Sequence, residues 1–182
     1  GVRTYSWDGN DWIQNVGNLA GAASYDEFGK DIAVSYSTDT LLIVGAHRND
    51  ENGSNAGQVT VYKMNGNSWV QYGSTLKGEA ANDLFGYSVA ISGDGSRIIV
   101  GAPRNNGNGI GSGQVKIYEW NGTDWQQFGS DFYGIAASDE CGRSVALNYS
   151  GRIAAVGAPL NDGNWNNAGQ VRLYEDGIQG LN

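Results

Sequence analysis

The sequence predicts an all-β protein built from a tandem repeat. Two motifs recur at a spacing of 56 residues: Gly-Ala at positions 45, 101 and 157, and Gly-Gln-Val beginning at positions 57, 113 and 169. The composition, with 29 Gly and only 2 Pro, is typical of short strands joined by tight turns. A period of this length indicates stacked supersecondary units, so the 182 residues are expected to form one array without a linker.

The repeat divides the chain into about three and a quarter copies. Two copies are complete, over residues 28–84 and 85–140, and two are partial, over residues 1–27 and 141–182. The first complete copy is one residue longer than the second, and the extra residue falls in a predicted turn.

Each complete copy is predicted to contain four strands. The first alternates between apolar and small residues, as in Ile32 and Val34, and the second is a continuous apolar run such as Leu41–Val44. The third alternates, with Val59 and Val61 on a packed face and polar residues on the other. The fourth begins at a Trp, and the whole chain is expected to hold thirteen strands.

Short turn sequences join the third and fourth strands. Asp8-Gly9, Asn65-Gly66 and Asn121-Gly122 predict type I′ hairpins, which need positive φ at both central residues. A Trp follows each turn at positions 12, 69 and 125. A Trp that recurs once per unit is most often a packing anchor between units, so all three are predicted to be buried.

The repeated motifs resemble those of a known family. Phe85-Gly86, Gly101-Ala102-Pro103 and Gly113-Gln114-Val115 resemble the FG-GAP repeat of integrin α chains, and are similar to tandem arrays in secreted and surface proteins of marine bacteria and algae. The resemblance implies β-propeller-type blades, in which four antiparallel strands radiate from a central axis. Periodicity by itself indicates only four-stranded repeats. The copies depart from the motif at Cys141, where Phe is expected, and at His47, where Pro is expected.

Some blades of this family carry calcium in the loop between the first two strands. The corresponding runs are Tyr36–Asp39, Gly93–Ser96 and Tyr149–Gly151, which offer at most one carboxylate each. Calcium prefers six to eight oxygen ligands. We therefore predict no metal site and no cofactor, and a fold that does not require calcium.

The loops after the Gly-Ala-Pro element are the predicted binding loops, because they vary while their flanks repeat. The candidate ligand-binding residues are Asn49, Asp50, Asn105, Asn106, Asn161, Asp162 and Trp165. Trp165 has no counterpart in the other copies and is expected to be an exposed contact residue. The alternative is that these Asn, Asp and Gly residues only form turns.

The inventory for catalysis is small, and no catalytic residue is predicted. His47 and Cys141 are the single His and Cys of the chain. His47 is interpreted as a structural replacement of Pro, and Cys141 as a small buried apolar residue in place of Phe. The glycines at positions 107–111 lack the following helix that a phosphate loop requires.

Charge excludes some partners. A net charge of -8 and the lack of a basic sequence cluster argue against nucleic-acid binding, and no apolar run is long enough to insert in a membrane. Three glycosylation sequons, at Asn52, Asn121 and Asn148, fall in predicted turns and permit a glycoprotein without indicating one.

The leading hypothesis is a non-enzymatic binding or structural module, extracellular or on the cell surface, that presents inter-strand loops to a protein or glycan. The alternatives are an architectural repeat of a filament or coat, and a hydrolase-type enzyme with its site at the propeller axis. Three and a quarter copies are too few to close a propeller, which needs at least about four blades. Further repeats of a longer chain, or another copy, are therefore expected to cover the terminal blades.

Overall fold

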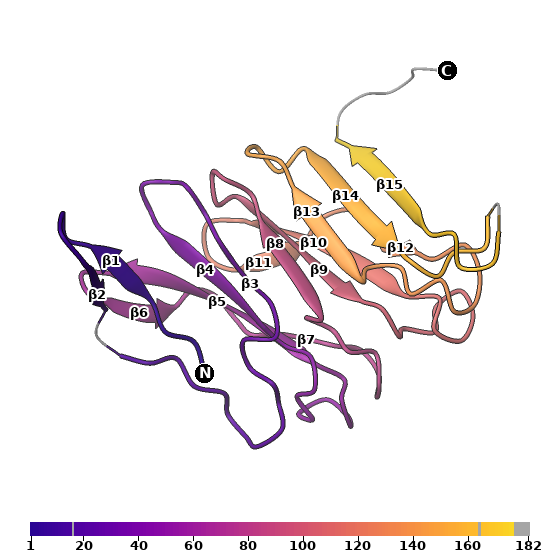
Figure 1. The fold of residues 1–182 in the computed structure, drawn as a ribbon, viewed down its shortest axis with the longest axis horizontal. Helices are drawn as coiled ribbons and strands as arrows, with labels where there is room; N and C mark the ends of the chain where they lie inside the picture. The colour runs from indigo at the N-terminus through magenta and orange to yellow at the C-terminus, as the bar shows by residue number, and fades with distance from the viewer. Residues whose placement is uncertain (16, 164, 177–182) are drawn as a thin grey trace.

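The computed structural model describes residues 1–15, 17–163 and 165–176. The all-β prediction is confirmed: the described residues contain no helix, and their fifteen strands form four antiparallel sheets (Figure 1).

Each sheet is formed by consecutive strands. The first is the hairpin of β1 (Tyr5–Trp7) and β2 (Trp12–Gln14). Blade 1 contains β3 (Ile32–Val34), β4 (Leu41–Ala46), β5 (Gln58–Asn65), β6 (Ser68–Gln71) and β7 (Leu76–Lys77). Blade 2 contains β8 (Ser88–Ile91), β9 (Arg97–Ala102), β10 (Gln114–Trp120), β11 (Trp125–Gln127) and β12 (Phe132–Tyr133). Blade 3 contains β13 (Ser144–Leu147), β14 (Ile153–Ala158) and β15 (Gln170–Glu175).

The predicted strand count was two too low, because the outer strand of each complete copy is split. Strands β6 and β7 both pair with β5, and β11 and β12 both pair with β10. Between the two parts lie Gly73 and Gly129, with φ of 82° and 74°. This left-handed backbone interrupts the ladder, so one predicted strand becomes two short ones.

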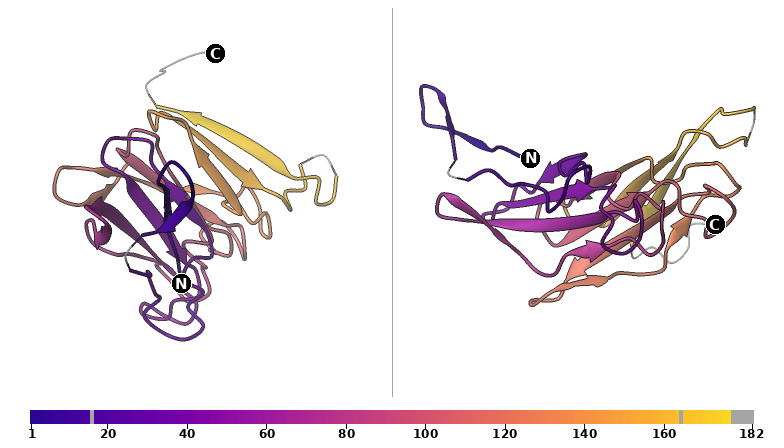
Figure 2. Two further views of the ribbon diagram at one scale, coloured as in Figure 1. Left: turned by 60° about the vertical axis from the view of Figure 1, so that its left-hand side comes forward. Right: turned by 90° about the horizontal axis from the view of Figure 1, so that it is seen from below.

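The blades follow one another in chain order, as the colours of Figure 1 and Figure 2 show, and neighbouring blades pack against each other. One core lies between blades 1 and 2 and another between blades 2 and 3. The first contains Ile43 and Val61 from blade 1 with Phe85 and Ile98 from blade 2. Each core contains residues of two adjacent blades, so the apolar side chains of one blade are buried by the next blade.

Glycines of the repeated motifs permit this close stacking. A Cβ placed on Gly45 would lie 2.1 Å from the carbonyl oxygen of Gly86 in the next blade. The same contact recurs at 2.0 Å between Gly101 and the carbonyl oxygen of Gly142. No side chain fits there, so the Gly of the Gly-Ala element and the Gly after Phe or Cys fix the blade spacing together.

The three repeated Trp residues have different environments. Trp125 is buried and donates from Nε1 to the Tyr72 carbonyl of blade 1 over 3.0 Å, as expected of an anchor between units. Trp69 is partly buried and donates to Thr4 over 2.8 Å. The prediction for Trp12 was wrong, because this side chain is 63% exposed. Its hairpin has no preceding sheet to pack against within the described residues.

The predicted type of the hairpin turns also needs correction. In the hairpin turns only Gly9, Gly66 and Gly122 have positive φ, so these are not type I′ turns. Asp8 and Asn121 instead accept hydrogen bonds from backbone N–H groups two and three residues later.

The third strand was predicted to have a polar outer face, but in blades 1 and 2 both of its faces are covered. Thr60 and Lys116 are buried as well as the alternating valines. The Lys116 ammonium pairs with Glu79 at 2.7 Å and Asp131 at 3.2 Å. Burial lowers its pKa, but the two carboxylates outweigh that effect and raise it. A buried charge is tolerated here because it is paired.

Candidate functional site

Three of the predicted binding residues are structural. Asn49, Asn105 and Asn161 are buried, and each amide nitrogen donates over 2.9 Å to a buried carboxylate two residues before the Phe-Gly or Cys-Gly element. The acceptors are Asp26, Asp83 and Asp139. We call this the Asp–Asn pair of each blade. It fixes the base of the predicted binding loop, and its side chains are not available to a partner.

The Asp–Asn pair imposes an unusual backbone on the segment before each blade. The residues on both sides of each Asp have positive φ: Tyr25, Glu27, Asn82, Leu84, Ser138 and Glu140. Such conformations cost roughly 1 to 3 kcal/mol each and persist only where the surroundings hold them. Backbone hydrogen bonds to the carboxylate, such as that from Ala80 to Asp83 at 3.1 Å, supply part of that hold.

The next three predicted residues are exposed but close the same loops. Asp50, Asn106 and Asp162 each accept a hydrogen bond from the backbone N–H five residues later, over 2.7, 2.8 and 2.7 Å. One side-chain oxygen of each of these residues thus closes a turn, as the turn-forming alternative proposed. Their remaining polar atoms lie at the surface.

The tips of the loops carry exposed apolar side chains. Trp165 is 78% exposed, in agreement with the sequence expectation, and Ile110 is similarly exposed on the preceding loop. A binding role for Trp165 stays a prediction.

The sequon residues Asn52, Asn121 and Asn148 are exposed. The Asn52 amide nitrogen, to which a glycan would be attached, donates to the Gly78 carbonyl over 2.7 Å. Glycosylation there would have to break this hydrogen bond.

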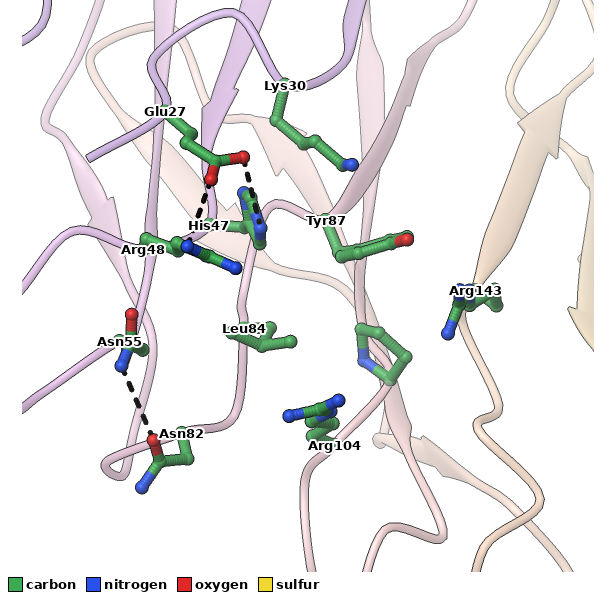
Figure 3. Close-up of a pocket in the computed structure, with 11 residues that line it drawn as sticks. Glu27, Lys30, His47, Arg48, Asn55, Asn82, Leu84, Tyr87, Arg104 and Arg143 are labelled. Carbon is green, nitrogen blue, oxygen red and sulfur yellow. Dashed lines mark hydrogen bonds and ion pairs between the residues drawn. The ribbon is translucent and has the colours of Figure 1, made fainter. Parts of the chain in front are cut away.

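A hollow of about 450 Å³ that the sequence did not predict lies beside these loops (Figure 3). Residues of all three blades and of the segments before them line it: Glu27, Lys30, His47, Arg48, Asn55, Asn82, Leu84, Tyr87, Pro103, Arg104 and Arg143. Four of these are Lys or Arg, out of 11 in a chain whose net charge is -8. The hollow is thus a local basic region on an acidic protein.

The repeat explains why these side chains meet. Lys30, Tyr87 and Arg143 each directly follow Phe-Gly or Cys-Gly, just before the inner strands β3, β8 and β13. Strand β8 contacts both β3 and β13, and the three strands are equivalent in the repeat. Their first residues therefore lie on the same side of the stacked blades. Arg48 and Arg104 form a second equivalent pair, after the Gly-Ala element.

Only part of the positive charge in the hollow is neutralised. Arg48 pairs with Glu27 at 3.1 Å, and Arg143 pairs with Glu140. Among the residues that the structure describes, Lys30 and Arg104 have no carboxylate within ion-pair distance. The Lys30 ammonium lies over the Tyr87 ring, 4.6 Å from its centroid, and the Arg143 guanidinium lies 5.0 Å from the same centroid.

His47 forms a buried wall of the hollow. Its ring packs edge-on against Tyr87, with centroids 5.3 Å apart, and its Nε2 lies 3.8 Å from Glu27. Its Nδ1 has no hydrogen-bond partner within the described ranges. Burial lowers the pKa of His47, although the Glu27 carboxylate acts in the opposite direction.

The carboxylates in the turns between the first two strands contact other groups of the chain. Asp94 supplies the one carboxylate of its turn, and its Oδ1 accepts from the Ser92 hydroxyl at 2.6 Å and the Ser96 N–H at 2.9 Å. In blade 1, Asp39 pairs with Lys63 at 2.8 Å. The Asp94 carboxylate thus closes its own turn, whereas that of Asp39 pairs with the neighbouring strand β5. No cluster of three metal-binding side chains occurs within the described residues.

The arrangement defines a class of protein: a tandem array of antiparallel blades, with loops and a basic hollow on the side where the inner strands begin. The model of the FG-GAP repeat matches residues 20–62 and 75–118. These two segments are thus FG-GAP repeats, and the blades are of the β-propeller type, as the motifs predicted. The comparison with curated proteins found no match. In the described part of the chain, no helix is long and apolar enough to cross a membrane.

Proposed function

We propose that this chain is a non-enzymatic, extracellular or cell-surface binding module whose loops contact a protein or glycan partner. The observation that carries the proposal is the contrast between the buried base and the exposed tip of one loop. Asn161 is held by Asp139, whereas Trp165, four residues later, is 78% exposed. A fixed loop base limits the ordering cost of binding, and exposed aromatic residues are frequent anchors.

The character of the hollow favours binding over catalysis. Its lining combines unpaired cations with Asn side chains, and no Ser or Cys nucleophile is among the described residues that line it. A hydrolase at the propeller axis would need a nucleophile or an activated water beside a general base. Among the described lining residues, His47 and Glu27 are the candidate bases. His47 is buried against Tyr87, which fits a packing role, and Glu27 pairs with Arg48.

We also propose that further repeats of the same type cover the terminal blade faces, either from a longer chain or from a second copy. Val171 and Leu173 of blade 3 are each 72% exposed. Their equivalents in blade 2, Val115 and Ile117, are buried against blade 3. An apolar blade face of this kind is expected to have a partner.

Binding can be tested on an array of immobilised glycans and extracellular matrix proteins. We expect the wild type to bind at least one of them, Trp165→Ala to weaken that binding at least tenfold, and Trp12→Ala, another exposed Trp, to leave it unchanged. Thermal unfolding should show that Trp165→Ala changes stability by no more than roughly 0.5 kcal/mol. No binding, or equal binding by both variants, would contradict the proposal.

Localisation can be tested with antibodies against the chain. They should label intact cells that produce it, or detect it in their medium. Signal restricted to permeabilised cells would contradict an extracellular or cell-surface position.

A further inference from the structure

We propose that the basic hollow binds the acidic group, a carboxylate or a sulfate, of an acidic saccharide. This inference rests on the proposed binding role and narrows its ligand. The first observation is the convergence of cations from three successive blades on one space of about 450 Å³, a volume typical of small-ligand sites. Figure 3 shows Lys30, Arg104 and Arg143 around it.

The positive charges of the hollow are only partly compensated. Lys30 and Arg104 lack a carboxylate partner within the described ranges, in a chain with 19 Asp and Glu against 11 Lys and Arg. Mutual repulsion of cations destabilises a fold unless something offsets it. An oxyanion in the hollow would offset it, and the planar guanidinium of Arg104 suits a carboxylate or sulfate through paired hydrogen bonds.

A second observation points to a ligand independently of the charges. The Nδ1 atom of His47 is buried and has no hydrogen-bond partner among the described residues. Buried polar atoms are nearly always hydrogen-bonded, so an orphan beside a hollow indicates a missing partner. Nδ1 is closed off from the hollow in this structure, so the His47 ring would have to move for a bound polar group or its ordered water to supply that partner.

The polar lining favours a saccharide over an acidic peptide. The Asn55 and Asn82 side chains, 3.5 Å apart in a long amide contact, offer donors and acceptors to hydroxyl groups. Leu84 and Pro103 are the only aliphatic or proline side chains among the lining residues within the described part of the chain. Peptide recognition usually adds apolar pockets for anchor side chains.

The test is calorimetric titration of the full chain with four probes. These are trigalacturonate for the carboxylate, a sulfated dextran oligosaccharide for the sulfate, neutral dextran, and poly-glutamate. We expect at least one acidic saccharide to bind and neutral dextran not to bind. The double variant Lys30→Ala/Arg104→Ala should weaken binding at least tenfold.

The matched control is Arg152→Ala. Arg152 is exposed in the turn after β13, at the opposite end of that strand from Arg143, and its loss changes the net charge in the same direction. Binding by this variant should stay within about twofold of wild type. Because Lys30 and Arg104 make no side-chain hydrogen bond or ion pair in the described structure, the double variant should unfold close to the wild-type temperature. The Arg152 Nη2 donates to the Asp176 carbonyl over 3.0 Å at the surface, so Arg152→Ala should lower the unfolding temperature slightly.

Three results would overturn the inference: no binding of either acidic saccharide, equal weakening by Arg152→Ala, or equally tight binding of poly-glutamate. The titration can fail to show binding of an acidic saccharide while Trp165→Ala still weakens binding to a partner on the array. In that case the proposed function stands and only the acidic-saccharide site is wrong.

Discussion

Blades 2 and 3 place the same repeat positions in opposite environments. Val115 and Ile117 of blade 2 are 0% and 7% exposed, whereas Val171 and Leu173 of blade 3 are both 72% exposed. The strands have the same pairing, since β10 lies beside β9 as β15 lies beside β14. The difference therefore comes from the neighbouring blade, and burial in this array is a property of the interface between two copies.

The largest expected effect distinguishes a Trp between two blades from a Trp at the end of the array. Trp125→Ala removes a buried ring, its hydrogen bond to Tyr72 and its edge contact with Trp120, and should cost roughly 3 to 5 kcal/mol. Trp12→Ala, at the equivalent exposed position, should change stability by no more than roughly 0.5 kcal/mol. Denaturant unfolding measures both. Equal losses would mean that the neighbouring blade does not determine the environment of this position.

The Asp–Asn pair should behave differently, because it is buried in every blade. Asp83→Ala leaves Asn105 and the Ala80 N–H without an acceptor, which should cost about 1 to 3 kcal/mol. Asp26→Ala, which breaks the equivalent pair before blade 1, should cost a similar amount. If Asp83→Ala destabilises the protein and Asp26→Ala does not, the contribution of the Asp–Asn pair depends on the neighbouring blades, as that of the Trp does.

A smaller effect concerns His47, which occupies the position of Pro103 in blade 2. Burial lowers its pKa in the folded state, so the unfolded chain binds more protons. The stability that this difference contributes is present above the unfolded pKa of about 6.5 and is lost as the pH falls through it.

His47→Pro should remove this pH dependence. It should also stabilise the fold by about 0.4 to 1 kcal/mol, provided that the backbone at this position matches that of its Pro equivalents. Thermal unfolding of both proteins between pH 7.5 and 5.5 checks this. A variant with the same slope as wild type would show that another group titrates.

The smallest expected effect is that of calcium. Chelation with EDTA should shift the melting temperature of the chain by no more than a few degrees, because the turn carboxylates are engaged in hydrogen bonds and ion pairs. A larger decrease, reversed by added calcium, would show that metal stabilises the blades.

Much of the fold was predictable because it depends on local patterns. The period, the antiparallel strands and the buried Cys141 all follow from spacing and alternation within a copy. The exposure of Trp12 was missed, since a repeat pattern does not report whether a neighbour is present. The split outer strand was missed because Gly73 and Gly129 are single residues, each directly after an aromatic residue, in segments that otherwise read as strand.

The candidate site was less predictable, for a similar reason. Asp26, Asp83 and Asp139 recur at the repeat spacing, which was a usable signal for the Asp–Asn pair, but an Asp beside a loop is easily taken for a turn residue. Lys30 and Arg143 are 113 positions apart in sequence and line one hollow only because three blades stack. Such convergence requires the tertiary structure.

The molar mass in dilute solution tests most directly whether the terminal blade faces are docking surfaces. Light scattering over a concentration series should give a mass that rises above the 19.3 kDa of one chain. The double variant Val171→Lys/Leu173→Lys, which places charges on the exposed face of blade 3, should reduce that mass to the monomer value without unfolding the protein. A stable monomer of 19.3 kDa at all concentrations, with no binding of a hydrophobic dye, would contradict the proposal that these faces bind a further repeat or a second copy.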